Sequence, residues 1–396
     1  MSLQRLTMLR AKGFRSLAEV DVPLGPLTVL VGPNGSGKTN VLGVLRFLAS
    51  TVRFDLAAAI DSAGGYLYVQ RQDGRGPSSR VVLGVQGIVT THASLSALDE
   101  YELKFYQSTR DRLIREESFV WKRTPGQGRR LTVKGTKVEF GTDDMDERNR
   151  ETRQLANRQA TGLATLPDWS DEEGGEGIRL LAGFLSGIRI LEPDMQAARR
   201  PSRIIPGPLA DDASNLASAL HNLSLSEPDS FAILVDEVKA CLPGLDAIEF
   251  ELLGGSSRAV MVVLRERGVR MPIELADASF GTVRLLALLT ALHEPDQPPF
   301  TAIEEADHGL HPYALDLLVE RLRAASEHTQ LLATTHAPTL VNRLRPRELV
   351  VCDRDPATGA SKIPALNAYK IARRKRKSEQ GLGELWFAGA LGGVPG

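Results

Sequence analysis

Two stretches of the chain carry the apolar patterning of an α/β protein. Near the amino terminus, the apolar run at residues 26–31 precedes a glycine-rich turn, and the next segment, VLGVLRFLAS, has apolar residues at helical spacing. In the last third, the run FTAIEE is followed by a helical pattern from Pro312 and then by the apolar segment QLLATTH. This alternation predicts a mostly parallel sheet covered by helices on both faces.

The middle of the chain is patterned differently. Between residues 79 and 138, short alternating or β-branched runs predict an antiparallel β layer (RVVLGVQGIV, YELKFY, SFVWKR, RLTVKG). The sequence then becomes polar, and the acidic, glycine-containing segment 171–177 indicates a linker. Further on, ASNLASALHNL and DSFAILVDEVKACL have helical spacing, and residues 247–268 predict a hairpin that turns at Gly254 and Gly255.

These patterns divide the chain into three regions. We expect residues 1–140 and residues 248–396 to form the two parts of one α/β unit, and residues 141–247 to form a partly helical insertion between them. No sustained heptads occur in the insertion, so the sequence predicts a compact molecule without a long coiled-coil arm.

Composition excludes several classes of protein. The chain has 48 Lys and Arg residues against 49 Asp and Glu residues, so any contact with DNA requires a local basic surface. No apolar run is long enough to cross a bilayer, and the first residues lack the apolar core of a secretion signal. Cys241 and Cys352 form neither a disulfide framework nor a metal-ligand cluster. We therefore expect a cytoplasmic protein with no membrane partner.

The glycine-rich turn matches the phosphate-binding pattern G-x-x-x-x-G-K-[ST] in full and joins a predicted strand to a predicted helix. The backbone N–H groups of such a loop, together with the helix N-terminus, bind phosphate oxygens. We expect Lys38 to contact the β and γ phosphates and Thr39 to offer its hydroxyl to Mg²⁺. The sequence thus predicts ATP and Mg²⁺ as ligands, with contacts from Gly32, Pro33, Asn34, Gly35, Ser36, Gly37, Lys38, Thr39 and Asn40.

Two adjacent carboxylates end the run FTAIEE. Because successive side chains of a strand point in opposite directions, we expect Glu304 to hold Mg²⁺ together with Thr39, and Glu305 to act as general base on the attacking water. A solvated acidic strand end would explain the pair equally well in isolation. The phosphate-binding motif upstream favours the catalytic interpretation.

Other polar residues follow the same strands. His336 ends the next apolar strand, where its imidazole can donate a hydrogen bond to the γ-phosphate or to the attacking water. Ser279 precedes an apolar helix, whose N-terminus is suited to an anion. Asp307, His308 and His311 lie in a loop that enters a helix, which favours a structural role over a transition-metal site.

With these motifs in this order, the sequence resembles the RecF, SMC and OLD-like branch of ABC-type ATPases, in particular the stand-alone prokaryotic members. The segment Ala278-Ser279-Phe280-Gly281-Thr282-Val283-Arg284 is similar to the family signature L-S-x-G-x-x-R and departs from it at Ala278. The resemblance implies a P-loop ATPase head that forms an ATP-dependent homodimer. It also implies that Ser279 and Gly281 of one subunit contact the γ-phosphate held by the other.

The resemblance carries further expectations. The opening phrase LRAKGFRSL is similar to the first strand of RecF-like heads, which implies that Arg15 approaches the nucleotide. Glu304 stands where the family has aspartate, so its longer side chain alters the metal geometry. The glutamine loop of the family has no distinguishing context here, and Gln70, Gln72 and Gln86 remain its candidates.

The leading functional hypothesis is an ATPase switch in DNA repair or anti-phage defence, with DNA or a neighbour-encoded effector or nuclease as partner. The alternatives are the nucleotide-binding subunit of an ABC transporter and an OLD-like nuclease. Asp353-Arg354-Asp355 suggests the nuclease, although PATG at residues 356–359 predicts a hairpin turn there. For DNA, the candidate basic groups are residues 373–377, Lys122-Arg123, Arg129-Arg130 and Arg199-Arg200.

Overall fold

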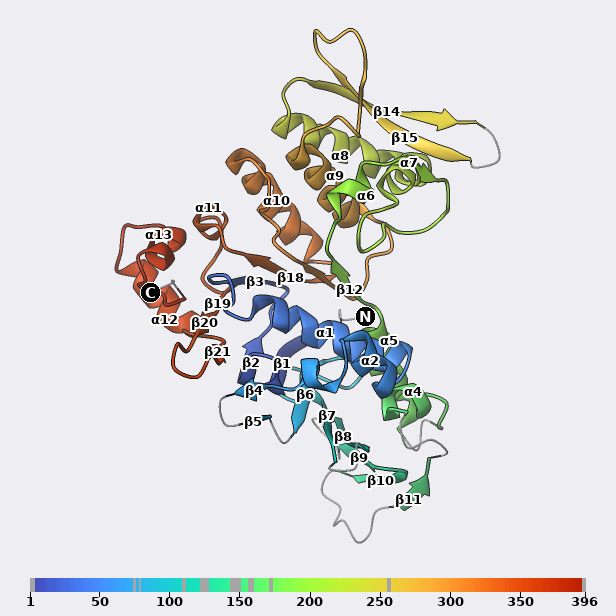
Figure 1. Ribbon diagram of the computed structural model, residues 1–396, viewed down its shortest axis with the longest axis vertical. Helices are drawn as coiled ribbons and strands as arrows, with labels where there is room; N and C mark the ends of the chain where they lie inside the picture. Colours follow the sequence, from blue (N-terminus) through green and yellow to red (C-terminus); the bar gives the residue numbers. More distant parts are fainter. Residues whose placement is uncertain are drawn as a thin grey trace.

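The computed structural model describes residues 4–73, 76–77, 80–108, 112–121, 128–142, 151–155, 160–170, 174–254 and 258–393. Its centre is a five-stranded parallel sheet in the order β12-β17-β18-β3-β19 (Figure 1). The strands are β12 (Ile188–Leu191), β17 (Phe300–Ile303), β18 (Gln330–Thr335), β3 (Leu27–Val31) and β19 (Leu349–Val351). This confirms the parallel sheet predicted from the two ends of the chain.

Every residue of these five strands is buried, because each face of the sheet is covered. Along β3, Leu27, Val29 and Val31 belong to the core on the helical face, whereas Leu30 belongs to the core on the opposite face. The apolar runs that predicted these strands are nearly continuous because their side chains pack into a hydrophobic core on each face of the sheet.

An antiparallel sheet lies on one side of the parallel sheet (Figure 1). Its eight strands run in the order β11-β10-β9-β8-β7-β6-β1-β2, which confirms the predicted antiparallel layer. They are β1 (Arg5–Phe14), β2 (Leu17–Pro23), β6 (Val81–Ile88), β7 (Asp99–Gln107), β8 (Leu113–Trp121), β9 (Arg129–Lys134), β10 (Lys137–Thr142) and β11 (Glu151–Gln154). The expected turn between β8 and β9 includes residues 122–127, which lie outside the described residues.

Helix α1 (Lys38–Arg53) packs between the two sheets. Its apolar side contacts the antiparallel sheet through Phe47, which stacks on Phe105 and meets Phe14 edge to face. The shorter helices α2 (Leu56–Ser62), α3 (Tyr66–Val69) and α4 (Gly162–Thr165), with α5 (Gly175–Ser186), and the small hairpin β4 (Gln72–Asp73) and β5 (Gly76–Pro77), complete this lobe.

Helices cover the opposite face of the parallel sheet. They are α6 (Met195–Ala198), α7 (Leu216–Ser226), α8 (Pro228–Cys241), α9 (Phe280–His293) and α10 (Pro312–Ala325). A second antiparallel unit packs on them, formed by β13 (Ser202–Arg203), β14 (Leu245–Leu253), β15 (Ala259–Glu266) and β16 (Ile273–Glu274). The β14–β15 pairing confirms the predicted hairpin, whose turn includes Gly254; Gly255 lies outside the described residues.

The end of the chain returns to the parallel sheet. Helix α11 (Pro338–Val341) lies between β18 and β19 in the chain. After β19, a short hairpin of β20 (Asp353–Arg354) and β21 (Ser361–Lys362) lies beside β2, and α12 (Ala368–Arg376) and α13 (Leu382–Phe387) follow at the same end of the molecule as α11 (Figure 1). The hairpin confirms the turn predicted at PATG. Within the described ranges the longest helix has 16 residues, so no long coiled-coil arm is formed there.

Two sequence expectations need correction. The range 141–247 is not only an insertion, because β12 within it pairs in parallel with β17 and is a strand of the central sheet. The predicted linker at residues 171–177 contains the start of α5, which begins at Gly175 after Gly174 with a φ of +95°. Buried Ile178, Leu181 and Leu185 follow at helical spacing, and this apolar side outweighs the flexibility of the glycines. Residues 171–173 lie outside the described residues.

No helix in the described part of the chain is both long enough and apolar enough to cross a membrane.

The joint between the two large sheets predicts a specific effect on stability. The buried amide of Gln330 in β18 accepts from the Leu6 N–H at 2.8 Å and donates to the Leu6 carbonyl at 2.7 Å and the Gly25 carbonyl at 2.9 Å. Gln330→Leu removes these partners inside the core and should lower the free energy of urea unfolding by about 2–4 kcal/mol. The matched control is Gln196, an exposed glutamine of α6. Gln196→Leu should change the free energy of urea unfolding by less than about 0.5 kcal/mol. Equal effects of the two substitutions would contradict this role for Gln330.

Candidate functional site

The phosphate-binding loop connects the buried strand β3 to α1 at the carboxyl edge of the parallel sheet. Two of its glycines have left-handed backbone conformations, with φ of +77° at Gly35 and +104° at Gly37. A Cβ atom at Gly32 would collide with the Cys352 carbonyl oxygen, and one at Gly37 would collide with the Ser361 hydroxyl. The loop therefore needs glycine for its conformation and for its close approach to neighbouring strands.

Lys38 lies inside this loop. Its Nζ donates to the Gly32 carbonyl at 2.7 Å and to the Pro33 carbonyl at 3.0 Å, and only 8% of the residue is exposed. Burial lowers the pKa of Lys38, although nearby Glu305 acts in the opposite direction. Next to it, the Ser36 hydroxyl is buried without a hydrogen-bond partner among the described residues. The loop thus contains a buried cation and a spare hydroxyl where phosphate oxygens would bind.

The two expected metal ligands are in direct contact. Thr39 Oγ1 donates to Glu304 Oε1 at 2.5 Å, joining the start of α1 to the end of β17. Burial raises the pKa of Glu304, and so does a hydrogen bond with Glu192, a residue directly after β12. Glu192 also pairs with Arg46 at 2.6 Å. Oxygen atoms of Thr39 and Glu304 therefore meet at one point, with Glu192 behind them, and oxygen is the donor atom that Mg²⁺ prefers.

Glu305 occupies a strained turn. It is one of few non-glycine residues with a positive φ, at +47°. Its N–H donates to Thr334 Oγ1 at 2.9 Å, and the buried guanidinium of Arg284 donates to the carbonyls of Glu304 at 2.7 Å and Glu305 at 3.0 Å. These bonds hold the turn from two sides. The carboxylate itself is partly exposed and lines the same pocket as Glu304.

The Glu305 carboxylate has two imidazoles beside it. His308 Nδ1 lies 3.4 Å from one oxygen, and His336 Nδ1 lies 4.0 Å from the other. His336 follows β18 directly, as the sequence predicted, and is partly exposed. A carboxylate, an imidazole and open space next to the phosphate loop form the arrangement needed to orient a water molecule and accept its proton.

The residues similar to the signature begin α9. Ser279 is its N-cap, and its Oγ accepts from the Thr282 N–H at 3.1 Å. The backbone at Gly281 packs against the Gly309 carbonyl, so a side chain there would collide with it. Phe280 contacts the His308 ring, with centroids 5.3 Å apart. Arg284 therefore shares its helix with Ser279 while it supports the Glu305 turn.

A pocket of about 300 Å³ brings most predicted residues together. It is lined by Ser16, Asn34, Gly35, Gly37, Lys38, Thr39, Asn40, Glu304, Glu305, Thr334 and Arg354. Ser279 and Gly281 are not among its lining residues. The pocket thus joins the phosphate loop to the two carboxylates and leaves the signature segment outside.

A second hollow of about 630 Å³ shares Ser16 and Arg354 with this pocket. It is also lined by Arg15, which has a φ of +48° and lies over the Phe14 ring at 5.4 Å. Burial and the nearby charge of Arg46 lower the pKa of Arg15. The exposed ring of Tyr68 lines the same hollow. Arg15 therefore lies next to the phosphate pocket rather than inside it.

The structure separates the three glutamine candidates from the carboxylates. Gln70 and Gln72 line the second hollow, and Gln86 lies in β6 of the antiparallel sheet. The sequence interpretation missed Glu192, whose side chain reaches Glu304. The sequence does contain a signal for this residue. The short run IRIL is followed directly by Glu192, just as the run FTAI is followed directly by Glu304. Because the run lies within the range 141–247, the insertion pattern around it conceals a strand of the central sheet.

Several other sequence candidates have structural roles. Arg199 donates to the Ala278 carbonyl at 2.8 Å, and Arg129 and Arg130 lie in β9. Asp355 accepts from the N–H groups of Ala357 and Thr358 within the β20–β21 turn. Lys122 and Arg123 lie outside the described residues. Among the residues that are described, no three His, Cys, Asp or Glu side chains form a metal-binding group, either at residues 307–311 or at residues 353–355.

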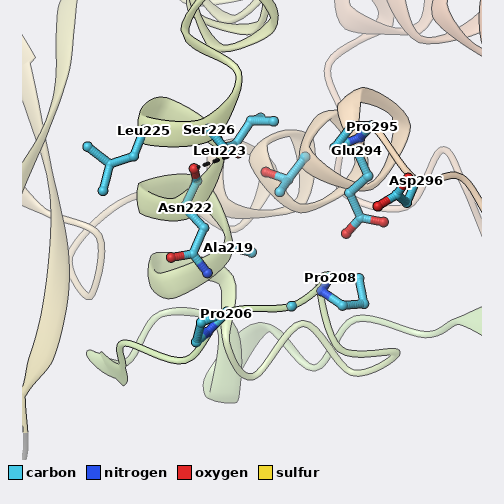
Figure 2. A pocket seen from close by; sticks show the side chains of 12 residues that line it. Pro206, Pro208, Ala219, Asn222, Leu223, Leu225, Ser226, Glu294, Pro295 and Asp296 are labelled. Atoms are coloured by element: carbon cyan, nitrogen blue, oxygen red, sulfur yellow. Dashed lines mark hydrogen bonds between the residues drawn. The ribbon is translucent and has the colours of Figure 1, made fainter.

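A further hollow of about 610 Å³ lies away from the phosphate loop, between α7 and the end of α9. Figure 2 shows Asn222 and Leu225 of α7 on one side, Glu294 and Asp296 on the other, and Pro208 below them. The buried Glu294 carboxylate is already bonded to Arg189 and to the Leu209 N–H. No Lys or Arg is among the residues that line this hollow, and its two hydroxyls, those of Ser226 and Thr290, donate to helix carbonyls.

Comparisons with known proteins agree with this geometry. The family described as "AAA domain, putative AbiEii toxin, Type IV TA system" matches residues 27–342, which include both carboxylates and the phosphate loop. A DNA replication and repair protein RecF of Streptomyces avermitilis is 27% identical over 232 residues, covering 52% of this chain and 61% of that protein. An OLD nuclease of Thermus scotoductus is 49% identical over 47 residues, covering 12% of this chain and 9% of that protein.

The chain therefore spans less than two thirds of the length of each of these relatives. Among solved structures, an Smc head bound to the C-winged helix domain of ScpA has a TM-score of 0.52 and 15% identity, with 93% of this chain and 99% of that chain covered. This likeness concerns the fold alone. The family match covers most of the chain and includes the glycine-rich loop and the paired carboxylates. The chain belongs to this AAA-domain family, within the RecF, SMC and OLD-like branch of ABC-type ATPases.

Proposed function

We propose that the protein is an ATP-binding, Mg²⁺-dependent ATPase head that acts as a nucleotide-gated homodimer. The observation that carries this proposal is the convergence of Lys38, Thr39, Glu304 and Glu305 on one pocket at the carboxyl edge of the parallel sheet. Ligands of open α/β sheets bind at this edge. The reaction is hydrolysis of ATP by water to ADP and phosphate.

Lys38 and the loop bind the phosphates. Nζ of Lys38 is held by two loop carbonyls and can exchange them for phosphate oxygens without moving far. Asn40 Nδ2 donates to Ser16 Oγ, which in turn contacts Ser361 Oγ at 2.6 Å, so the start of α1 is tied to the carboxyl-terminal hairpin. The adjoining hollow, with Arg15 and Tyr68, suits the nucleoside, because an aromatic ring and guanidinium groups can stack on a base.

Thr39 and Glu304 are the residues that would hold Mg²⁺. The ion would neutralise charge on the phosphate oxygens during hydrolysis. Glu304 reaches Thr39 in spite of its additional methylene relative to aspartate, so the hydroxyl and the carboxylate fit one small cation. Glu192 orients Glu304 from the far side and is itself held by Arg46. Such outer contacts fix the orientation of metal ligands.

Glu305 is the general base of the proposed mechanism. Its carboxylate accepts a proton from the attacking water, and His336 stabilises the charge that develops at the γ-phosphate. Thr334 and Arg284 hold the backbone of Glu305 in its left-handed turn, so the carboxylate is oriented before ATP binds. In this mechanism the protein orients the attacking water and the phosphates and forms no covalent intermediate.

The signature residues act in trans in this proposal. Ser279 and Gly281 do not line the phosphate pocket of their own chain, and Phe280 beside them is 39% exposed. A second subunit, related by a two-fold axis, would bring them to the γ-phosphate. ATP then favours the closed dimer because only this state makes the additional contacts.

The dimer cycle would serve DNA repair or anti-phage defence, with DNA or a separate effector as the partner. The similarity to a RecF protein and to an OLD nuclease supports this context. The family match favours it over a transporter subunit. Asp353 and Asp355 form a turn rather than a metal cluster, which disfavours cleavage activity in this part of the chain.

Trans action gives a complementation test. Lys38→Ala and Ser279→Arg should each abolish hydrolysis as homodimers. A mixture of the two contains hybrid dimers in which one of the two sites has an intact Lys38 and an intact Ser279. Equal mixing should therefore restore about a quarter of the wild-type phosphate release. Mixing Lys38→Ala with Thr39→Ala is the control and should restore nothing, because both changes are in the same half-site. Restoration in the control, or none in the first mixture, would contradict trans action.

The clamp on Glu305 predicts a separate kinetic effect. Arg284→Gln should lower kcat on the order of tenfold to a hundredfold, the usual loss when a group that orients a catalytic residue is removed. KM for ATP should change little, because Arg284 does not line the pocket. Arg284→Lys should recover part of kcat, since an ammonium can still donate to a carbonyl.

Arg323 provides the matched control for Arg284. Its guanidinium also donates to a backbone carbonyl, that of Arg343, and pairs with Glu348, so its bonds support residues other than Glu304 and Glu305. Arg323→Gln should affect the unfolding midpoint and leave kcat unchanged. A raised KM with unchanged kcat for Arg284→Gln would refute the positioning role.

A further inference from the structure

Helix α12 concentrates positive charge that the ATPase site does not use. Six cations lie within eight residues at its carboxyl-terminal end: Lys370, Arg373, Arg374, Lys375, Arg376 and Lys377. Only Lys375 is half-buried, where it donates to the Gln380 carbonyl at 2.8 Å; the others are exposed. The chain as a whole has a net charge of −1, so this is a local feature.

Four of these cations share one face. Lys370, Arg373, Arg374 and Lys377 recur at the i, i+3, i+4 and i+7 positions, which face the same way on a helix. The helix is anchored to the core by Ile371, the buried residue of α12. Within the described ranges, none of the four lies within ion-pair distance of a carboxylate. We call these four side chains the α12 basic face.

This face is costly for an isolated helix. Cations in the last turn interact favourably with the helix dipole, but one or two are sufficient for that effect. Like charges three or four residues apart on a helix repel and destabilise it, and four pairs have this spacing: Lys370–Arg373, Lys370–Arg374, Arg373–Lys377 and Arg374–Lys377. A bound polyanion would remove this repulsion. The arrangement is therefore better suited to an anionic partner than to stability.

We propose that the α12 basic face is the surface on which this protein binds the phosphate backbone of a nucleic acid. This inference rests on the proposed function, which includes a nucleic acid as partner. It adds the surface of the protein that contacts this partner. Seven residues of helix rise about 10 Å, so the face spans only a few phosphates. Tyr369, 69% exposed on the same helix, offers a ring for stacking with a base.

The same residues disfavour a membrane as the partner. A helix that lies in a bilayer interface buries an apolar side opposite its cations. On α12, the buried apolar residue is Ile371, which is already packed in the protein core and is not available to a bilayer. Backbone contacts without base-edge contacts make the expected binding independent of sequence and sensitive to salt.

The test is fluorescence anisotropy of a labelled 30-nucleotide single strand and of a 30-base-pair duplex, without ATP. The triple variant Arg373→Gln, Arg374→Gln and Lys377→Gln keeps helix-forming residues and removes three charges. It should raise Kd at least about tenfold at 0.1 M salt and reduce the slope of log Kd against log salt by roughly two to three. Because ATP is absent, a chain that failed to bind nucleotide would still give this result.

The matched control removes three exposed arginines in or beside the β13–β16 unit. Arg200→Gln, Arg203→Gln and Arg270→Gln change the net charge equally and should leave Kd within about twofold of wild type, since screening weakens charges beyond about 10 Å. Thermal unfolding of both variants checks that they remain folded. Equal loss in the control, or an unchanged salt slope in the α12 variant, would overturn the proposal. So would binding to phosphatidylserine vesicles in the absence of binding to either nucleic acid.

Discussion

The site depends on the parallel hydrogen bonding of β18 to β3 on one side and to β17 on the other. β3 leads to the phosphate loop and β17 to the two carboxylates, so β18 sets the distance between Lys38 and Glu305. β18 also ends in Thr334, which bonds to the Glu305 N–H, and is followed by His336. A shift of this strand would alter phosphate binding, the general base and the histidine together. Gln330, at its other end, ties it to the antiparallel sheet.

The structure concentrates conformational cost where the chemistry is proposed. Glu305 and Arg15 adopt positive φ angles, and Glu304 is a half-buried carboxylate hydrogen-bonded to Glu192. Such conformations persist only where surrounding groups determine them, and here the bonds from Thr334 and Arg284 do so. Because Arg284 and Ser279 belong to the same helix, contact with a partner's nucleotide and the orientation of the chain's own general base share one rigid element. This arrangement gives a physical route by which two sites of a dimer influence each other.

The sequence was sufficient for the parts that depend on local chemistry. The phosphate loop requires glycines, a lysine and a threonine in fixed order, and the antiparallel layer requires alternation, so both were predicted. Glu192 was missed because its strand is only four residues long and lies within a range that otherwise resembles an insertion. The clamp by Arg284 was also missed, because its bonds to residues 304 and 305 depend on how α9 packs on the sheet. Contacts between segments so distant in sequence are set by tertiary packing rather than by a local pattern.

Closure of the dimer by ATP is the central claim, and light scattering tests it most directly. The mass in solution is measured for wild type and for Glu305→Gln, each with and without ATP and Mg²⁺. Without the general base, bound ATP is not hydrolysed, so Glu305→Gln should remain a dimer with ATP while wild type returns to its nucleotide-free mass as ATP is consumed. A mass that is the same in all four conditions would contradict a nucleotide-gated dimer and would indicate a fixed assembly.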